Sequence, residues 1–502
     1  MSLLGLDVGT TGCKAVLFRA DGTVRGSAYA EYENRSPGPG RFELDTEAVW
    51  AQIKAMIQAV CAAAPNDPVR ALAVASMGEA VVPVTRQRQI LGPSILNFDE
   101  RGQEYLYRLS AILSDERLYA INGNTLGNHY SMTKLMWIQE HQPELYERAD
   151  YFLHWSSFVA FMLGAEPALD YSLANRTLLF DLERLHWSAE LLDIANLDAS
   201  RLPPTIPSGQ VIGQVLPSLA EELNLPAGVA IVSGAHDQCA NGVGCGILHA
   251  GQAMYGMGTY LTIMPAFYRR PAPEAMIKCG LSTEHHAVPG LFVSFIYNMG
   301  GALVKWQRDT FAAAEKASAR PEGRDLYAEL LAEMPVEPGK IVVLPHFSTT
   351  GPPDYIANSF GVIAGLRLES SRGAILKGIL EGVSFALRQN LDGLPGTGIE
   401  ISELRVVGGG SRSDAWVQLS ADILGVPCVR SANLQAGSLG AAILAGTAIG
   451  EFANLDEGCQ AMVQLGKQFA PDPVRGREYA GLYEKYNRLW PLMEDYLREL
   501  AK

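Results

Sequence analysis

Short apolar runs separated by glycine-rich turns mark the first 30 residues of the chain. The run over residues 4–8 carries one acid, Asp7, and breaks at residues 9–12, which read Gly-Thr-Thr-Gly. Alternating apolar residues follow, up to a second turn at Asp21 and Gly22. A period of two that is interrupted by short turns predicts a β-hairpin.

The first turn of this hairpin admits two interpretations. Its free backbone N–H groups and small side chains would let phosphate oxygens approach closely. The Asp7 carboxylate beside it suits the Mg²⁺ that accompanies a nucleotide. Alternatively, residues 9–12 form an ordinary glycine-rich turn next to a half-buried acid. The residues of the hairpin alone leave both interpretations open.

Apolar periodicity over the rest of the first half alternates between helix and strand. An amphipathic pattern begins at Asp45-Thr46-Glu47, which is typical of a helix start. The prolines at 203 and 204 then introduce a β-rich region. The pattern predicts a helix over residues 44–64, strands over 69–76 and 80–85, and a mostly helical region over 99–163 with clear segments at 105–113, 133–139 and 158–163.

A buried strand followed by Gly-Ala-His-Asp-Gln is predicted at residues 229–238. Small residues then open a helix, so Asp237 stands between the end of a strand and the start of a helix. This position is favoured for chemistry in α/β proteins. A carboxylate here can also be a plain helix cap, and the local pattern does not decide between the two.

A second Gly-Thr turn at residues 256–259 repeats the opening hairpin about halfway along the chain. The repeat suggests two related domains that face each other, each with a phosphate-binding turn. Two unrelated turns among 50 glycines are the alternative. Further glycine-rich junctions at residues 298–302 and 406–411 favour the repeat, because such junctions present N–H groups and positive helix ends to phosphates.

Composition narrows the class of protein. A chain of 502 residues, 48% hydrophobic and 19% charged, is long enough for two or more domains with a large core. A net charge of −14 argues against nucleic-acid binding. We expect no membrane span and no signal peptide, and therefore a cytoplasmic protein. Seven scattered cysteines without a CxxC pair indicate a reducing compartment rather than a disulfide framework or a zinc site.

The order of the motifs resembles the FGGY family of carbohydrate kinases over nearly the whole chain. Each motif is loose, but their joint order and spacing are specific. The matching segments are residues 5–11, 98–101, 134–137, 170–172, 234–238, 256–259, 361–366, 380–382, 408–411, 421–427 and 437–442.

The resemblance implies an α/β fold of two actin-like (ribonuclease H-like) domains, each a mixed sheet flanked by helices, with a cleft between them. Residues 1–247 would bind the sugar and residues 248–502 the nucleotide. It also implies ATP and Mg²⁺ as cofactors, a small sugar or polyol as the partner molecule, and a possible homodimer.

Residue roles follow from the same resemblance. Asp237 would be the general base for the sugar hydroxyl, and Asp7 would hold Mg²⁺. Sugar contacts would come from Met77, Glu79, Asp99, Asp237 and Gln238. Nucleotide contacts would come from Thr10, Thr11, Lys14, Gly258, Thr259, Gly301, Gly410, Ser411 and Asp414.

Substrate signals conflict. Xylulokinase-like members carry Met-His-Gly where this chain reads Met77-Gly78-Glu79, whereas Glu79 and Gln238 resemble glycerol kinases. Asn97 stands where many members have Trp. Chain length and overall motif pattern resemble the xylulokinase-like branch, so we expect a pentulose such as xylulose. The alternatives are a kinase for glycerol, ribulose, erythritol, fuculose or gluconate, or a catalytically silent relative that binds sugar. The intact base and phosphate turns favour an enzyme.

Overall fold

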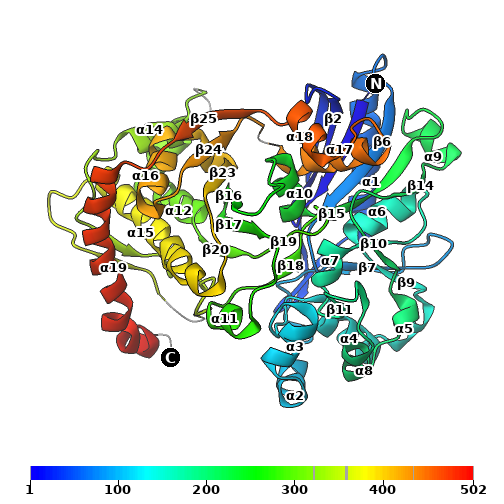
Figure 1. The fold of residues 1–502 in the computed structure, drawn as a ribbon, viewed down its shortest axis with the longest axis horizontal. Coiled ribbons are helices and arrows are strands. Elements are labelled where there is room, and N and C mark those ends of the chain that lie inside the picture. Colours follow the sequence, from blue (N-terminus) through cyan, green and yellow to red (C-terminus); the bar gives the residue numbers. More distant parts are fainter. Residues whose placement is uncertain (1, 320–322, 357–359, 434, 501–502) are drawn as a thin grey trace.

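Two sheets organise the molecule (Figure 1). The structure, a computed structural model, describes residues 2–319, 323–356, 360–433 and 435–500. The first sheet has the order β14-β15-β6-β1-β2-β3. Its strands are β1 (Ser2–Val8), β2 (Gly12–Arg19), β3 (Val24–Glu31), β6 (Val69–Ser76), β14 (Val211–Gln214) and β15 (Ala230–His236).

The second sheet is formed by the later part of the chain. Its order is β18-β19-β17-β16-β23-β24-β25, and β20 also pairs with β17. Its strands are β16 (Gln252–Met257), β17 (Tyr260–Phe267), β18 (Glu284–His285), β19 (Phe292–Val293), β20 (Ile296–Met299), β23 (Glu403–Val407), β24 (Cys428–Ser431) and β25 (Leu465–Phe469).

The two sheets repeat one arrangement of strands. β1 pairs antiparallel with β2 and parallel with β6, and β16 pairs antiparallel with β17 and parallel with β23. The order β3-β2-β1-β6-β15 therefore corresponds to β20-β17-β16-β23-β24. Both Gly-Thr turns lie between the first two strands of this unit, as the repeat in the sequence predicted. The predicted pair of mixed sheets flanked by helices is confirmed.

Most local elements match the sequence patterns. Helix α1 (Thr46–Ala63) begins where expected, and the Asp45 side chain accepts a hydrogen bond from the Ala48 N–H at 3.1 Å. The mostly helical region contains α2 (Tyr105–Ile112), α3 (Asp115–Asn122), α4 (Ser131–His141), α5 (Pro143–Arg148) and α6 (Trp155–Leu163).

Two local details go beyond the sequence patterns. The helical region also contains strand β9 (Tyr151–His154), which pairs antiparallel with β7 (Val81–Val84), so tertiary pairing outweighs the surrounding helical pattern. The glycine-rich junction at residues 298–302 contains the end of β20, with Asn298 and Met299, and the start of α12 (Gly301–Phe311).

Alternate faces of the first sheet pack against different helices. Leu4, Leu6 and Val8 of β1 share a core with α1 and α6. Leu3, on the opposite face, shares a core with α10 (Asp237–Gly244) and α17 (Ala436–Ala448). Helix α17 comes from late in the chain, yet it lies beside the blue strands of the first sheet (Figure 1). The first sheet is therefore completed by the C-terminal part of the sequence.

Glycines allow α17 to pack this closely. A Cβ atom at Gly440 would lie 1.9 Å from the Ala240 carbonyl oxygen, and one at Gly244 would lie 1.9 Å from that of Ala436. A Cβ at Gly5 of β1 would lie 1.8 Å from the Ser438 carbonyl oxygen. Even an alanine at these positions would force the two helices, or helix and sheet, apart.

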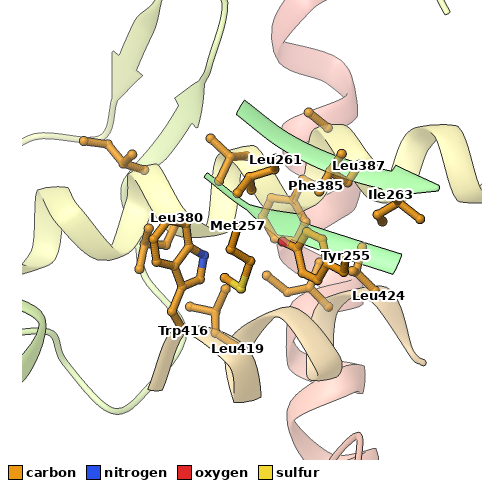
Figure 2. Close-up of a cluster of buried hydrophobic side chains, with 14 of the residues drawn as sticks. Tyr255, Met257, Leu261, Ile263, Leu380, Phe385, Leu387, Trp416, Leu419 and Leu424 are labelled. Atoms are coloured by element: carbon orange, nitrogen blue, oxygen red, sulfur yellow. The ribbon is translucent and has the colours of Figure 1, made fainter. Parts of the chain in front are cut away.

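The second sheet has its own core, built from β16 and β17 with α15 (Arg372–Gly393), α16 (Asp414–Leu424) and α19 (Pro473–Leu500). Figure 2 shows the centre of it, where Tyr255 and Met257 of β16 lie near Phe385, Trp416 and Leu419. Among the described residues, no helix is long and apolar enough to cross a membrane. The seven cysteines are free thiols, and all but Cys279 are buried.

Replacing Gly440 tests the α10–α17 contact. We expect Gly440→Ala to lower the free energy of unfolding by about 1–3 kcal/mol, because the new methyl group overlaps a backbone oxygen. Gly481→Ala in α19 is the matched control, since a Cβ there meets nothing within 4 Å and alanine favours helix. Urea denaturation of both variants measures the difference, and an equal stability would contradict the packing described.

Candidate active site

Three parallel strands end side by side at one edge of the first sheet. Val8 of β1 pairs with Ser76 of β6, and Ser76 pairs with His236 of β15. The edge therefore gathers Asp7 near the end of β1, the turn after β6 and Asp237, the first residue after β15. The carboxyl ends of parallel strands are the usual location of ligand sites in α/β sheets.

Asp237 has an unusual electrostatic environment. Burial raises its pKa to about 7, and the negative charges of Asp7 and Glu79 add to the rise, while Gln238 opposes it through hydrogen bonds. Its Oδ1 atom is buried and accepts no hydrogen bond within the described part of the chain. An unsatisfied carboxylate oxygen of this kind suits a hydroxyl donor from a ligand. The arrangement can therefore accept a proton near neutral pH.

His236, the last residue of β15, precedes Asp237 and lies close to its carboxylate. Its Nε2 is 3.3 Å from Asp237 Oδ1, and its backbone N–H donates to Ser172 Oγ at 2.9 Å. Burial, together with the Arg176 charge, holds the pKa of His236 well below its ordinary value, so the ring is neutral. A neutral imidazole leaves the Asp237 carboxylate without a fixed positive partner.

Glu79 is held in a strained backbone conformation. Its φ is 62°, in the left-handed region that a residue with a Cβ seldom adopts, and its side chain is buried. Glu79 Oε1 accepts hydrogen bonds from Nε of Arg176 at 2.6 Å and from its Nη2. Glu79 Oε2 lies 3.5 Å from the Asn97 amide nitrogen. One oxygen is thus fixed by a cation, and the other is only weakly engaged.

Arg176 is a site residue that the sequence analysis missed. Besides Glu79, it donates from Nη1 to Oε1 of Glu284 at 2.7 Å, and Glu284 belongs to the second sheet. A Cβ at Gly78 would lie 3.2–3.3 Å from Arg176 side-chain atoms, so glycine leaves room for the guanidinium. The available signal was a single cation within the apolar stretch 173–180.

Asp7 of β1 points its carboxylate at the first turn of α17. Burial raises its pKa to about 6, although the Lys14 charge opposes the rise. Lys14 faces Asp7 across the β1–β2 pair. A Cβ at Gly437 would lie 2.6 Å from Asp7 Oδ2, so the carboxylate occupies the space that a side chain would fill. Between these residues, the Gly9 N–H donates to the Gly12 carbonyl at 2.9 Å and closes the turn that carries the predicted Thr10 and Thr11.

The corresponding turn of the second sheet is built against helix α12. The Gly301 N–H donates to the Gly258 carbonyl at 3.0 Å, and the Ala302 N–H donates to that of Thr259 at 3.1 Å. A Cβ at Gly301 would lie 2.3 Å from the Gly258 oxygen. Gly301 thus fixes the turn that was predicted to meet phosphates.

The glycine-rich turn after β23 lies beside the Gly258 turn, because β16 and β23 are parallel neighbours. Gly408 has a φ of 91°, and a Cβ at Gly410 would lie 2.7 Å from the Trp416 ring. The Ser411 hydroxyl donates to the Gly408 carbonyl at 2.6 Å and stabilises the turn. An open cavity of about 1200 Å³, lined partly by Arg412, adjoins it. The cavity offers space for a nucleotide next to these turns.

Two predicted residues have other partners. Asp99 receives hydrogen bonds from Arg101 on both carboxylate oxygens and from the Phe42 N–H at 2.5 Å, and its side chain has 0% exposure. Burial acts to raise the pKa of Asp99, but these hydrogen bonds outweigh it and hold the pKa low. Asp414 pairs with Arg430 at 2.6 Å and Lys467 at 2.5 Å. Their ligand roles stay predictions.

A metal ion would need ligands from outside the protein. Within the described residues, no group of three or more His, Cys, Asp or Glu side chains could hold a metal ion. Mg²⁺ needs only one or two carboxylates when phosphates complete its shell. The buried Asp7 carboxylate, next to the Gly-Thr turn, fits that requirement.

Both parts of the chain match one protein family. Residues 2–244 match the N-terminal domain of the FGGY family of carbohydrate kinases, and residues 269–449 match its C-terminal domain. The chain belongs to this family. It is an ATP-dependent sugar kinase, as the order of the motifs predicted.

Individual relatives cover nearly the full length. A xylulose kinase of Staphylococcus epidermidis is 25% identical over 504 residues, covering 99% of this chain and 97% of its own. A glycerol kinase of Janthinobacterium is 28% identical over 494 residues, which cover 93% of this chain and 94% of the glycerol kinase. The crystal structure of a xylulose kinase from Rhodospirillum rubrum is 28% identical, with a TM-score of 0.87 and coverage of 99% and 100%. The two-domain actin-like fold is confirmed.

Gly437 offers a test of the Asp7 site. We expect Gly437→Ala to lower kcat/KM for ATP by roughly 10- to 100-fold, because the methyl group would displace the Asp7 carboxylate. Sugar affinity without nucleotide should stay unchanged. Gly396→Ala, in open space elsewhere in the same part of the chain, is the control. Steady-state kinetics with normal ATP dependence in Gly437→Ala would show that Asp7 does not serve the nucleotide.

Proposed function

We propose that this kinase transfers the γ-phosphoryl group of ATP to a hydroxyl of a pentulose such as xylulose, with Asp237 as the general base. The observation that carries the proposal is Oδ1 of Asp237, a buried carboxylate oxygen that accepts no hydrogen bond in the described part of the chain, at the edge where the strands of the first sheet end. Burial and the nearby acids also raise the pKa of Asp237 to about 7. Full-length relatives named as xylulose kinases support the choice of sugar.

Proton transfer in this proposal needs only the Asp237 side chain. Oδ1 accepts the proton of the attacking hydroxyl, while the sugar oxygen bonds to the γ-phosphorus and the bond from that phosphorus to the bridging oxygen of ADP breaks. A carboxylate with a pKa close to ambient pH is deprotonated in a large fraction of the molecules and still binds a proton strongly enough to take it from a hydroxyl. The two nearby carboxylates that raise this pKa therefore serve the reaction.

Sugar binding would use the turn after β6 and the start of α10. Glu79 Oε2 can accept hydrogen bonds from adjacent hydroxyls, and Gln238 can both donate and accept. Met77, which is buried beside them, would contact the carbon chain. We leave Asp99 out of the proposed contacts because Arg101 and Phe42 already occupy its carboxylate.

Phosphate binding would use both Gly-Thr turns. Thr10, Thr11 and Lys14 would hold the transferring group from the first half, and Gly258 and Thr259 the β- and γ-phosphates from the second. Bound Mg²⁺ would neutralise phosphate charge, and Asp7 would hold it. The nucleotide would extend past residues 408–411, so residues 1–247 would mainly bind sugar and residues 248–502 nucleotide.

A coupled assay of ADP release tests the reaction. We expect xylulose to raise ATP turnover above background more than glycerol, ribulose, erythritol, fuculose or gluconate does. Asp237→Asn should lower kcat by about 10²- to 10⁴-fold and keep sugar binding, because the amide retains the shape but cannot accept the proton.

The same panel separates the alternatives. A silent relative would bind sugar without any rise in turnover. A higher kcat/KM for glycerol than for xylulose would replace the proposed substrate and leave the kinase reaction intact. Near-normal turnover by Asp237→Asn would remove Asp237 from the mechanism.

Activity should depend on pH through the same carboxylate. Because the base acts when deprotonated and burial with nearby acids raises its pKa to about 7, kcat/KM for the sugar should fall as pH drops below about 7. Glu79→Gln removes one of the charges that raise the pKa of Asp237. The decrease of kcat/KM on the acidic side should therefore begin at a lower pH in this variant, whatever its maximal rate. A decrease that begins at the same pH in this variant would contradict the assignment.

A further inference from the structure

A buried ion-pair network joins the two halves at the proposed sugar site. Arg176, at the end of α7 (Tyr171–Asn175), lies between Glu79 of the first half and Glu284 of β18 in the second sheet. The side chains of Glu79, Arg176 and Glu284 are 5%, 14% and 1% exposed. Buried guanidiniums are retained only where carboxylates compensate them.

Each of the three nitrogens of Arg176 donates a hydrogen bond to one of these two acids. Nε and Nη2 donate to Glu79, and Nη1 donates to Glu284. The two carboxylates outweigh the effect of burial and hold the pKa of Arg176 well above its ordinary value, so its charge persists. Lys134, another buried cation, donates to three backbone carbonyls, of Asp99, Arg101 and Asn128. In the described part of the chain, Lys134 thus uses its three donors for the backbone, and every nitrogen of Arg176 already donates to an acid.

Two buried titratable groups packed near Arg176, His236 and Tyr130, add no positive charge. Burial holds the pKa of His236 well below its ordinary value, so its ring is neutral. Burial also raises the pKa of Tyr130, which therefore stays neutral. Asp237 and Asp7 contribute further negative charge when ionised. The site thus carries excess negative charge once both glutamates have paired with Arg176.

We propose that Glu284 is a specificity-determining residue: with Glu79 it neutralises Arg176, so that the site accepts neutral polyhydroxy substrates and rejects sugar acids. The proposal rests on the proposed sugar kinase function and adds the residue that sets the charge of the acceptor. A sugar carboxylate is bound most strongly by a guanidinium that can donate two parallel N–H groups to it. Glu284, from the opposite half of the molecule, pairs with Arg176 and so keeps the guanidinium from a sugar carboxylate. Gly78 leaves the room that Arg176 needs for this pairing.

Glu284→Gln tests this role. The amide oxygen can still accept from Arg176 Nη1, so the shape is kept while one negative charge is lost. Glu183→Gln is the matched control, because Glu183 also pairs across the halves, with Arg270 at 3.0 Å, but is 75% exposed. For each protein we would measure kcat/KM for xylulose and gluconate, and the binding of both sugars by calorimetry without ATP. Thermal unfolding checks that each variant is folded.

The wild-type protein and Glu183→Gln should favour xylulose over gluconate at least about tenfold, and Glu284→Gln should raise the gluconate-to-xylulose ratio about tenfold, in both turnover and binding. An unchanged ratio in a folded Glu284→Gln, with xylulose still phosphorylated, would overturn the role of Glu284 and leave the proposed function standing. Equal binding of both sugars by the wild type would overturn the inference even if Glu284→Gln failed to fold. A wild-type preference for gluconate would overturn both.

Discussion

The convergence of three buried or half-buried carboxylates at the ends of β1, β6 and β15 is the constraint on which the rest of the site depends. Parallel pairing brings Asp7, Glu79 and Asp237 to one edge of the first sheet, where burial and mutual repulsion raise the pKa of Asp237 to about 7. Such a cluster costs folding free energy unless cations, or the ligand that it is built for, compensate it. The burial and repulsion that cause this cost also raise the pKa of Asp237, which makes it a base of useful strength near neutral pH.

The second half of the chain supplies much of that compensation. Glu284 fixes Arg176 from β18, and Arg176 fixes Glu79, so a contact between the halves orients a residue of the proposed sugar site. Helix α17 returns to the first sheet, and Gly437 at its start leaves the space that the Asp7 carboxylate occupies. The proposed sugar and nucleotide regions would therefore each draw residues from both halves.

Local patterns in the sequence predicted the parts of the site that short segments encode. The hairpin turns, the strand before Asp237 and the glycine junctions each follow from periodicity and turn chemistry within a few residues. Contacts between distant segments could not be predicted in this way: Arg176 and Glu284 are 108 positions apart, and α17 packs on strands at the opposite end of the chain. β9 was missed because its pairing with β7 outweighs the helical pattern around it. For Asp99, the resemblance alone indicated a sugar contact, whereas the structure shows its carboxylate occupied by Arg101.

The central claim is that the two Gly-Thr turns and Asp237 surround one transferring phosphoryl group. A crystal structure of the kinase with xylulose and a non-hydrolysable ATP analogue tests it most directly. We expect one sugar hydroxyl about 2.6–3.2 Å from an Asp237 carboxylate oxygen and on the side of the γ-phosphate, with that phosphate between the turns at Thr10 and Thr259. A γ-phosphate held away from either turn, or a sugar whose hydroxyls all lie beyond hydrogen-bond reach of Asp237, would contradict the account.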